Sequence, residues 1–257
     1  MLNLASWNVN SLKVRLPHVL DWLADKQTDI LALQETKLID ENFPHAVIEE
    51  KGYYVCFSGQ KTYNGVAILS RFPMHDVETD VPGLIDPQRR ILAATINNIR
   101  VINLYVPNGA SLDSDKYSYK LDWLKHVSQY VHDQLEKYDY LAVVGDFNIA
   151  PSDLDVHDPK EWVECVLVSQ KEREAFANLL NMGLVDSFRH QNPDSPTYSW
   201  WDYRAASFRR NRGLRIDHIL TSPLLTEKLK ETGIDKEPRK WEQPSDHAPV
   251  WASFNFP

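Results

Sequence analysis

The chain has 257 residues, of which 43% are hydrophobic and 25% are charged. This composition excludes an intrinsically disordered chain and allows one large α/β domain or two small ones. The net charge of −8, taken alone, argues against a nucleic-acid partner, because phosphates repel an acidic surface. A cluster of buried carboxylates holding a metal would account for part of that charge.

The cysteines and the N-terminal residues indicate the cellular compartment in which the protein is expected. Cys56 and Cys165 lie far apart and have no neighbouring Cys or His at metal-ligand spacing, so they predict neither a disulfide framework nor a zinc site. No apolar stretch is long enough to span a membrane, and the N-terminus lacks the basic and apolar blocks of a signal peptide. We therefore expect a cytoplasmic protein without membrane attachment. No linker or repeat divides the chain, which favours one domain over residues 1–257.

Short apolar runs predict nine strands, interrupted by three amphipathic helices. The strands are expected at residues 2–7, 30–34, 53–58, 65–70, 91–96, 100–105, 141–145, 216–220 and 248–254. Helical spacing of apolar residues marks 16–23, 124–135 and 176–180, the last closing at Gly183. Asn97-Asn98 suggests a tight hairpin turn. Many strands with single helices between them predict an α/β fold of packed sheets flanked by helices.

Polar residues recur at the ends of these strands. They are Asn8, Glu35, Tyr105, Asp146 with Asn148, Asp217, and Asp246 with His247. Any one of them is better explained as a turn residue or helix cap. Six cases together are more informative, because neighbouring strands bring their ends together in space.

This set of side chains favours metal-assisted chemistry on a phosphodiester. Carboxylate and amide oxygens with one imidazole suit Mg²⁺ or Mn²⁺, whereas a zinc site usually contains more His or Cys ligands. A metal can neutralise the phosphate and stabilise the leaving oxygen, while Asp and His handle the proton of the attacking water. The chain has no P-loop, nucleophile elbow or HExxH motif, so those enzyme classes are unsupported.

Seven sequence blocks, in order, resemble the motif series of the exonuclease III family. These bacterial abasic-site endonucleases form a branch of the endonuclease/exonuclease/phosphatase superfamily. The blocks are Trp7-Asn8-Val9-Asn10, Leu33-Gln34-Glu35-Thr36-Lys37, Tyr63-Asn64-Gly65-Val66-Ala67, Tyr105-Val106-Pro107-Asn108-Gly109, Gly145-Asp146-Phe147-Asn148, Arg212-Gly213-Leu214-Arg215-Ile216-Asp217 and Ser245-Asp246-His247-Ala248-Pro249-Val250. Each block is weak by itself, but together they span almost the whole chain.

The resemblance implies a four-layer α/β sandwich, with two central mixed β-sheets flanked by helices and an active site at one rim. It implies Mg²⁺-dependent hydrolysis of phosphoesters in double-stranded DNA that carries abasic sites or blocked 3′ ends, with Mn²⁺ as a substitute. The activities would be abasic-site incision, 3′-end cleaning including 3′-phosphate removal, and 3′→5′ exonuclease. We expect the enzyme to act as a monomer.

The resemblance also implies roles for individual residues. Glu35 matches the main metal carboxylate, with Asn8 beside it, and Asp246 matches a possible further metal ligand. Asp146 matches the residue that orients or deprotonates water, and Asn148 matches its partner at the phosphate and the metal. Tyr105 and Asn108 match phosphate-site residues. His247 matches the imidazole that contacts the scissile phosphate or the metal, and Asp217 would hold and charge that ring.

Contacts with DNA follow from the same resemblance. Trp200, Leu214 and Ile216 match an apolar pocket for a flipped-out abasic sugar, and Trp201 would pack beneath it. For Leu214 and Ile216, an ordinary place in the core fits the sequence equally well. Arg89, Arg90 and the arginines of residues 204–215, Arg212 among them, would meet the phosphate backbone.

The stretch 153–169 departs from the family pattern. Leu167 and Val168 fall where the rim of the pocket should be. A bulky residue there would narrow the pocket and favour trimming of 3′ ends over incision at internal abasic sites.

Two alternatives compete with a DNA repair enzyme. Deoxyribonuclease I, sphingomyelinases, inositol-polyphosphate phosphatases and poly(A) deadenylases share the same metal site, although the Tyr105–Gly109 and Arg212–Asp217 blocks favour DNA repair. A catalytically dead DNA-binding or scaffold protein is the alternative from another class, disfavoured because each catalytic position holds the matching residue type.

Overall fold

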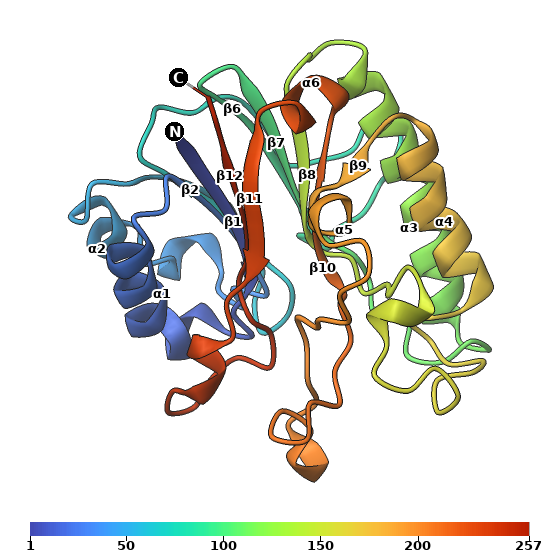
Figure 1. Cartoon of the computed structure of the whole chain (residues 1–257). Helices are drawn as coiled ribbons and strands as arrows, with labels where there is room; N and C mark the ends of the chain where they lie inside the picture. The colour runs from blue at the N-terminus through green and yellow to red at the C-terminus, as the bar shows by residue number, and fades with distance from the viewer. Residues whose placement is uncertain (257) are drawn as a thin grey trace.

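Two six-stranded β-sheets face each other in the computed structural model, which describes residues 1–256 (Figure 1). In spatial order, the first sheet contains β11 (Leu229–Ile234), β12 (Val250–Phe254), β1 (Leu2–Asn8), β2 (Ile30–Gln34), β4 (Val66–Ser70) and β3 (Tyr54–Ser58). The second contains β5 (His75–Glu78), β6 (Ile91–Ile96), β7 (Ile99–Tyr105), β8 (Leu141–Asp146), β10 (Asp217–Thr221) and β9 (Val185–Asp186). Each sheet has one parallel pair and is otherwise antiparallel, so both are mixed.

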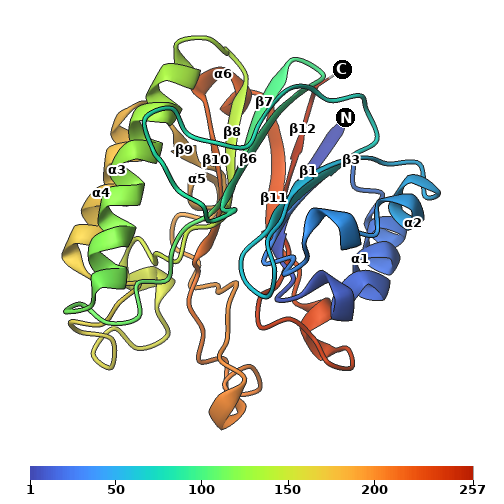
Figure 2. The same ribbon diagram turned by 180° about the vertical axis from the view of Figure 1, so that it is seen from behind.

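Helices cover the outer face of each sheet. Helix α1 (Leu12–Lys26) joins the parallel strands β1 and β2, and α3 (Asp115–Leu135) joins the parallel strands β7 and β8. Such a pair requires a crossover connection, which a helix supplies. Helix α2 (His45–Glu49) lies on the side of α1, and α4 (Gln170–Asn181) packs beside α3, as both views show (Figures 1 and 2). The predicted four-layer α/β sandwich is confirmed.

Shorter helices connect the remaining strands. They are α5 (Ser187–Gln191), α6 (Pro223–Thr226) and the 3₁₀ turns Asp40–Asn42, Asp153–Asp155, Arg204–Ala206 and Glu237–Lys240. Within residues 1–256, no helix combines the length and apolarity needed to cross a membrane.

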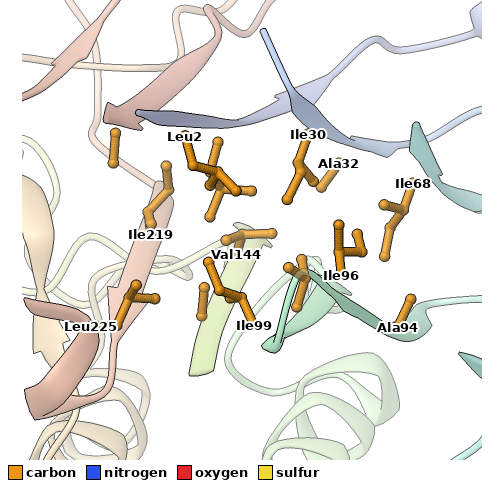
Figure 3. Packing of buried hydrophobic residues seen from close by; sticks show 14 of the residues in the cluster. Leu2, Ile30, Ala32, Ile68, Ala94, Ile96, Ile99, Val144, Ile219 and Leu225 are labelled. Carbon is orange, nitrogen blue, oxygen red and sulfur yellow. The ribbon is translucent and has the colours of Figure 1, made fainter. Parts of the chain in front are cut away.

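The space between the sheets is filled by aliphatic side chains from both inner faces (Figure 3). Successive strand residues alternate between this central core and the helices outside: Leu4 points inward, whereas Ala5 packs with the layer under α1. In β8, Val144 faces the central core and Val143 faces α3. Because both faces are covered, these strands appear in the sequence as continuous apolar runs.

The strands absent from the sequence-based prediction lie at sheet edges. All nine predicted strands exist, with ends shifted by one or two residues, but β5, β9 and β11 were not expected. Strand β5 is exposed along its whole length and β9 has only two residues, so neither has an apolar signature. The Asn97-Asn98 hairpin is confirmed, since both residues have positive φ (47° and 64°), as does Gly183 (104°) just after α4.

The loops that carry most of the polar strand ends gather at one edge of the sandwich. Leu2 pairs with Phe254, which places the two described ends of the chain at the opposite edge. The segment around Arg204–Ala206, orange in Figure 1, extends beyond the loop-bearing edge. The candidate site lies at that edge.

Candidate active site

Strand register places the polar strand ends side by side. In the second sheet Tyr105 pairs with Asp146, and Asp146 pairs with Asp217, so three neighbouring strands present these residues in one row. In the first sheet Asn8 pairs with Gln34, immediately before Glu35. Gly145 allows the close strand approach, because a Cβ there would lie 1.9 Å from the Leu104 carbonyl oxygen.

Glu35, Asp146 and His247 form the centre of the site. Each offers one ligand atom, and these atoms lie within 4.8 Å of one another. The buried amide of Asn8 bridges the two carboxylates, with Nδ2 donating to Glu35 Oε1 and to Asp146 Oδ2 at 2.9 Å each. Two carboxylates with a neighbouring imidazole are a donor set that fits a divalent cation. The cluster could therefore hold a metal ion.

Asp146 and Asn148 form one hydrogen-bonded unit. Asp146 Oδ1 accepts from the Asn148 backbone N–H at 2.9 Å, and Asn148 has a positive φ of 49° that turns its side chain back toward the carboxylate. Burial raises the pKa of Asp146 to about 7, although the neighbouring imidazole of His247 acts in the opposite direction. A buried carboxylate of this kind is stabilised by any cation placed beside it.

His247 is held by Asp217. Its Nδ1 lies 2.9 Å from Asp217 Oδ2, its Nε2 lies 3.7 Å from Asp146 Oδ2, and the Ser199 hydroxyl donates to Asp217 at 2.6 Å. Burial alone would lower the pKa of His247, but the Asp217 and Asp146 carboxylates outweigh it and raise the pKa to about 10. The ring is therefore protonated at neutral pH and carries a positive charge toward the cluster.

Tyr105 and Asn108 line a cleft of about 500 Å³ beside the cluster. Burial, together with the charges of Glu35 and Asp146, raises the pKa of Tyr105 well above its usual range, so it stays a neutral phenol. Asn108 Nδ2 donates to Asn148 Oδ1 at 3.2 Å. Arg90 lies over the Tyr105 ring, 4.7 Å from its centre, and supplies positive charge to the cleft.

Asp246 lies beside the central cluster without belonging to it. One oxygen accepts from the Trp200 indole N–H at 2.9 Å and the other from Asn10 Nδ2 at 3.0 Å. Ser245 bonds the Asn8 backbone carbonyl at 2.6 Å, which ties this segment to the end of β1. Asp246 thus orients Trp200 directly, while its part in metal binding remains a prediction.

The apolar residues expected to form a sugar pocket lie in a small packed cluster. Leu214 and Ile216 are only 0% and 1% exposed and share one buried cluster with Leu167, and Val168 and the half-buried Trp200 pack against this cluster. Trp201 is fully buried in a separate small cluster with Tyr198 and Ala248. Leu167 is 4% exposed and belongs to the same cluster as Leu214 and Ile216, at the place where the rim of the sugar pocket is expected.

The expectation that all arginines between residues 204 and 215 meet DNA is wrong for Arg215. Its side chain is buried and bonds Asp155 and Asp186 at 2.7 Å each, so it is an internal brace. Arg212 pairs with Glu161, and Arg204 pairs with Asp202 at 2.6 Å. Arg209 and Arg210 are exposed and form no ion pair within residues 1–256. Arg89 reaches Asp80 at a loose 3.5 Å and is partly exposed.

Sequence reasoning assigned no role to three residues that shape the site. Lys37 pairs with Glu35 Oε2 at 2.9 Å, Asn10 bonds Asp246, and Ser199 fixes Asp217. Lys37 and Asn10 lie inside two of the seven sequence blocks, so their spacing offered a signal. Ser199 is far from Asp217 in sequence, and only the fold brings the two together.

Comparison with known proteins places the chain in a family. Residues 5–247 match the endonuclease/exonuclease/phosphatase family. Exodeoxyribonuclease III of Haemophilus influenzae is 39% identical over 97% of this chain and 98% of its own. Exodeoxyribonuclease of Bacillus subtilis is 32% identical over 99% of this chain and 100% of its own.

Comparison with solved structures supports the same family assignment. The 3′ phosphatase NExo from Neisseria, bound to a product DNA hairpin, has a TM-score of 0.98 and 49% identity over 99% of this chain and 100% of its own. An AP endonuclease from Archaeoglobus fulgidus has a TM-score of 0.96 and 39% identity, with 99% and 100% coverage. Fold, cluster and relatives together define a hydrolase of the α/β-sandwich class. The chain belongs to the endonuclease/exonuclease/phosphatase family.

Proposed function

We propose that this protein is a Mg²⁺-dependent DNA repair phosphoesterase that removes blocking groups and nucleotides from 3′ ends of double-stranded DNA. The observation that carries the proposal is the cluster of the partly buried Glu35 with the buried Asp146 and His247 at the loop-bearing edge. Its relatives named above include an exodeoxyribonuclease III and a DNA-bound 3′ phosphatase, which supports DNA as the substrate.

The residues of the site suit hydrolysis of a phosphoester. Glu35 and Asp146, with Asn8, would hold Mg²⁺, or Mn²⁺ in its place. The ion would neutralise the phosphate and stabilise the leaving oxygen. Asp146 is placed to orient a water molecule and accept its proton, because the Asn8 amide and the Asn148 backbone N–H hold its carboxylate at the centre of the cluster. We assign Asp246 at most an auxiliary part in metal binding, since it lies beside the cluster of Glu35, Asp146 and His247 and not within it.

His247 is better suited to the phosphate than to the metal. With a pKa near 10, its ring is protonated and would donate a charged hydrogen bond to a non-bridging oxygen. Asp217 keeps the ring oriented. The neutral groups Asn148, Asn108 and Tyr105 would hold the other oxygens without adding negative charge, so we place them in the phosphate site.

The packed apolar cluster of Leu167, Leu214 and Ile216 supports 3′-end cleaning over incision at internal abasic sites. An extruded sugar would have to displace Leu167 from Leu214 and Ile216, with a loss of apolar contacts. A 3′-terminal phosphate needs no extruded sugar. We keep abasic-site incision and 3′→5′ exonuclease as further activities of the same site, and propose that internal incision is the weakest.

The proposal also covers the assembly. We propose a monomeric enzyme whose single catalytic domain spans residues 1–257 and which acts on DNA in the cytoplasm. Arg89, Arg90, Arg209, Arg210 and Arg212 would contact the phosphate backbone, with Trp200 and Trp201 bordering the site.

A substrate panel tests the function. The protein should remove a 3′-phosphate at a nick in the presence of Mg²⁺, stop with EDTA, and act much more slowly on a duplex with one internal tetrahydrofuran abasic analogue. Variants His247→Ala and Asp146→Asn should each lose at least about 100-fold in kcat while remaining folded. Efficient internal incision would overturn the preference for 3′ ends, and a fully active His247→Ala/Asp146→Asn double variant would overturn the mechanism.

A further inference from the structure

A fully buried ion pair lies directly behind the phosphate-holding amides. Lys120, on α3, and Glu172, in the first turn of α4, bond each other, and both side chains are 0% exposed. Two charges without solvent are costly to bury, so a pair of this kind is retained only where hydrogen bonds satisfy both groups. Neither residue belongs to the candidate metal or phosphate ligands.

The Lys120 ammonium holds the backbone of two site residues. Besides Glu172, its Nζ donates to the carbonyl oxygens of Asn148 at 2.7 Å and Asn108 at 3.1 Å. All three of its N–H donors are therefore used. Because the Asn108 and Asn148 side chains also bond each other, one cation sets the spacing of both amides at the phosphate site.

The Glu172 carboxylate holds the loop around Leu167, which is the pocket-filling loop of the proposed function. Its Oε1 accepts from the Leu167 backbone N–H at 3.0 Å, and its Oε2 accepts from the Ser169 N–H at 3.0 Å and hydroxyl at 2.6 Å. Leu167 has a φ of 79°, which is unfavourable for a leucine and persists only where surrounding contacts impose it. The carboxylate bond is one of these contacts, and the bond from Ala150 N–H to the Leu167 carbonyl, at 2.8 Å, is another.

We propose that the Lys120–Glu172 pair is a positioning device that couples the phosphate-binding amides to the pocket-filling loop and thereby sets the preference for 3′ ends. The inference rests on the proposed function. The pair makes Leu167 a rigid plug, so that substrates requiring an extruded sugar are refused. It touches no substrate and acts through Asn108, Asn148 and Leu167.

The ratio of two activities is the readout that a purely structural role would not move. In Glu172→Gln, one acceptor oxygen becomes a donor, so the bonds to Leu167 and Ser169 cannot all form. We expect internal abasic incision, relative to 3′-phosphate removal, to rise at least fivefold in kcat/KM. The matched control is Arg100→Met, which removes an equally buried cation at the far end of β7 and should lower stability but leave the ratio unchanged.

A double variant separates positioning from folding. Lys120→Met/Glu172→Leu replaces both charges with apolar groups, which commonly preserves stability, but it also releases Asn108, Asn148 and Leu167. It should unfold near the wild-type temperature and still show the raised ratio, together with at least a tenfold lower kcat for 3′-phosphate removal. A stable double variant with the wild-type ratio would overturn the proposal.

Non-additivity gives a second, independent check. Leu167→Gly removes the plug itself, so adding Glu172→Gln to it should change the ratio less than twofold. A further fivefold rise would overturn the coupling through Leu167. A wild-type protein without 3′-phosphatase or nuclease activity would instead overturn the proposed function, so the two failures are distinguishable.

Discussion

Asp146 and His247 are neighbouring buried ionisable groups whose pKa values are both raised, but for different reasons. Asp146 is 1% exposed and His247 is 4% exposed, with 3.7 Å between Asp146 Oδ2 and His247 Nε2. Burial disfavours the charged form of both side chains. At Asp146 this effect dominates and raises the pKa, whereas at His247 the neighbouring Asp217 carboxylate outweighs burial and keeps the ring protonated. The groups around each side chain therefore decide its protonation state.

Asp146→Asn should make the metal-free protein more stable above pH 7. A carboxylate whose pKa is raised from 3.8 to about 7 is destabilising when ionised, by at most about 4 kcal/mol on the scale of about 1.4 kcal/mol per pKa unit. We expect part of this, roughly 2 kcal/mol, as a gain in the free energy of unfolding. Urea unfolding at pH 8 in EDTA measures it.

The matched control for Asp146→Asn is Asp186→Asn. Burial would raise the pKa of Asp186, but Arg215 and His218 overcome this and lower it, so loss of its charge should destabilise the fold by roughly 3 kcal/mol. Equal effects of the two substitutions would contradict the assigned difference.

The pair of His247 and Asp217 predicts a pH dependence. The folded pKa of His247, about 10, lies above the ordinary histidine value of 6.5, so protonation stabilises the folded state. This contribution is complete below about pH 6.5, declines as the pH rises, and is lost above about pH 10. The stability difference between wild type and Asp217→Asn should shrink over that window. A difference that grows with pH in urea unfolding experiments would show the opposite sign.

At the scale of elements, the segment 204–215 contains arginines with two different functions. Arg215 directly precedes Ile216 and β10, where the chain turns inward, and it braces the Asp155 loop against β9. Arg209 and Arg210 lie on the exposed projection. Sequence spacing could not distinguish them, because burial depends on where the chain re-enters the fold.

These two groups of arginines should respond differently to substitution. Arg215→Met leaves two buried carboxylates without their cation and should cost about 3–5 kcal/mol in unfolding free energy. Arg209→Ala/Arg210→Ala should leave stability unchanged and reduce the slope of log affinity for DNA against log salt by up to about 2. Thermal unfolding and binding titrations at several salt concentrations measure both. A wild-type salt slope in the exposed double variant would remove these arginines from the DNA-binding surface.

At the scale of the whole molecule, the metal site joins the two sheets. Glu35 follows β2 of the first sheet and Asp146 ends β8 of the second, so a cation bound by both would link the halves of the sandwich. Ligand binding to the folded state alone adds stability in proportion to the logarithm of its concentration.

Mg²⁺ should therefore raise the unfolding temperature. At a concentration of about 100 times Kd, the gain is about 2.7 kcal/mol, and Glu35→Gln should abolish most of it. Asp133→Asn is a suitable control, because Asp133 belongs to an exposed acidic group on α3 that could also attract a cation. If Asp133→Asn removed the shift and Glu35→Gln did not, the metal would bind at α3. Calorimetry with and without EDTA distinguishes the two.

The chain sequence alone determined the elements with a strong local signature and the residue types of the site. Continuous apolar runs marked strands covered on both faces, and Asn97-Asn98 marked a hairpin that needs positive φ. Edge strands such as β5 could not be predicted from the sequence, because a solvated edge imposes no apolar pattern. Long-range pairs could not be predicted either, among them Ser199 with Asp217 and Arg215 with Asp186.

Tertiary structure decided which of those residues act on one another. The sequence contained Lys120, Glu172 and Leu167 without any sign of their relation, since their spacing fits ordinary helix surface and loop positions. Packing of α4 against α3 buried both charges and left them each other, the backbone of three loops and the Ser169 hydroxyl as partners. Burial is a property of the whole fold, and in this protein it raises the pKa of Asp146, encloses Arg215 with its two carboxylates and places Leu167 in the cluster with Leu214 and Ile216.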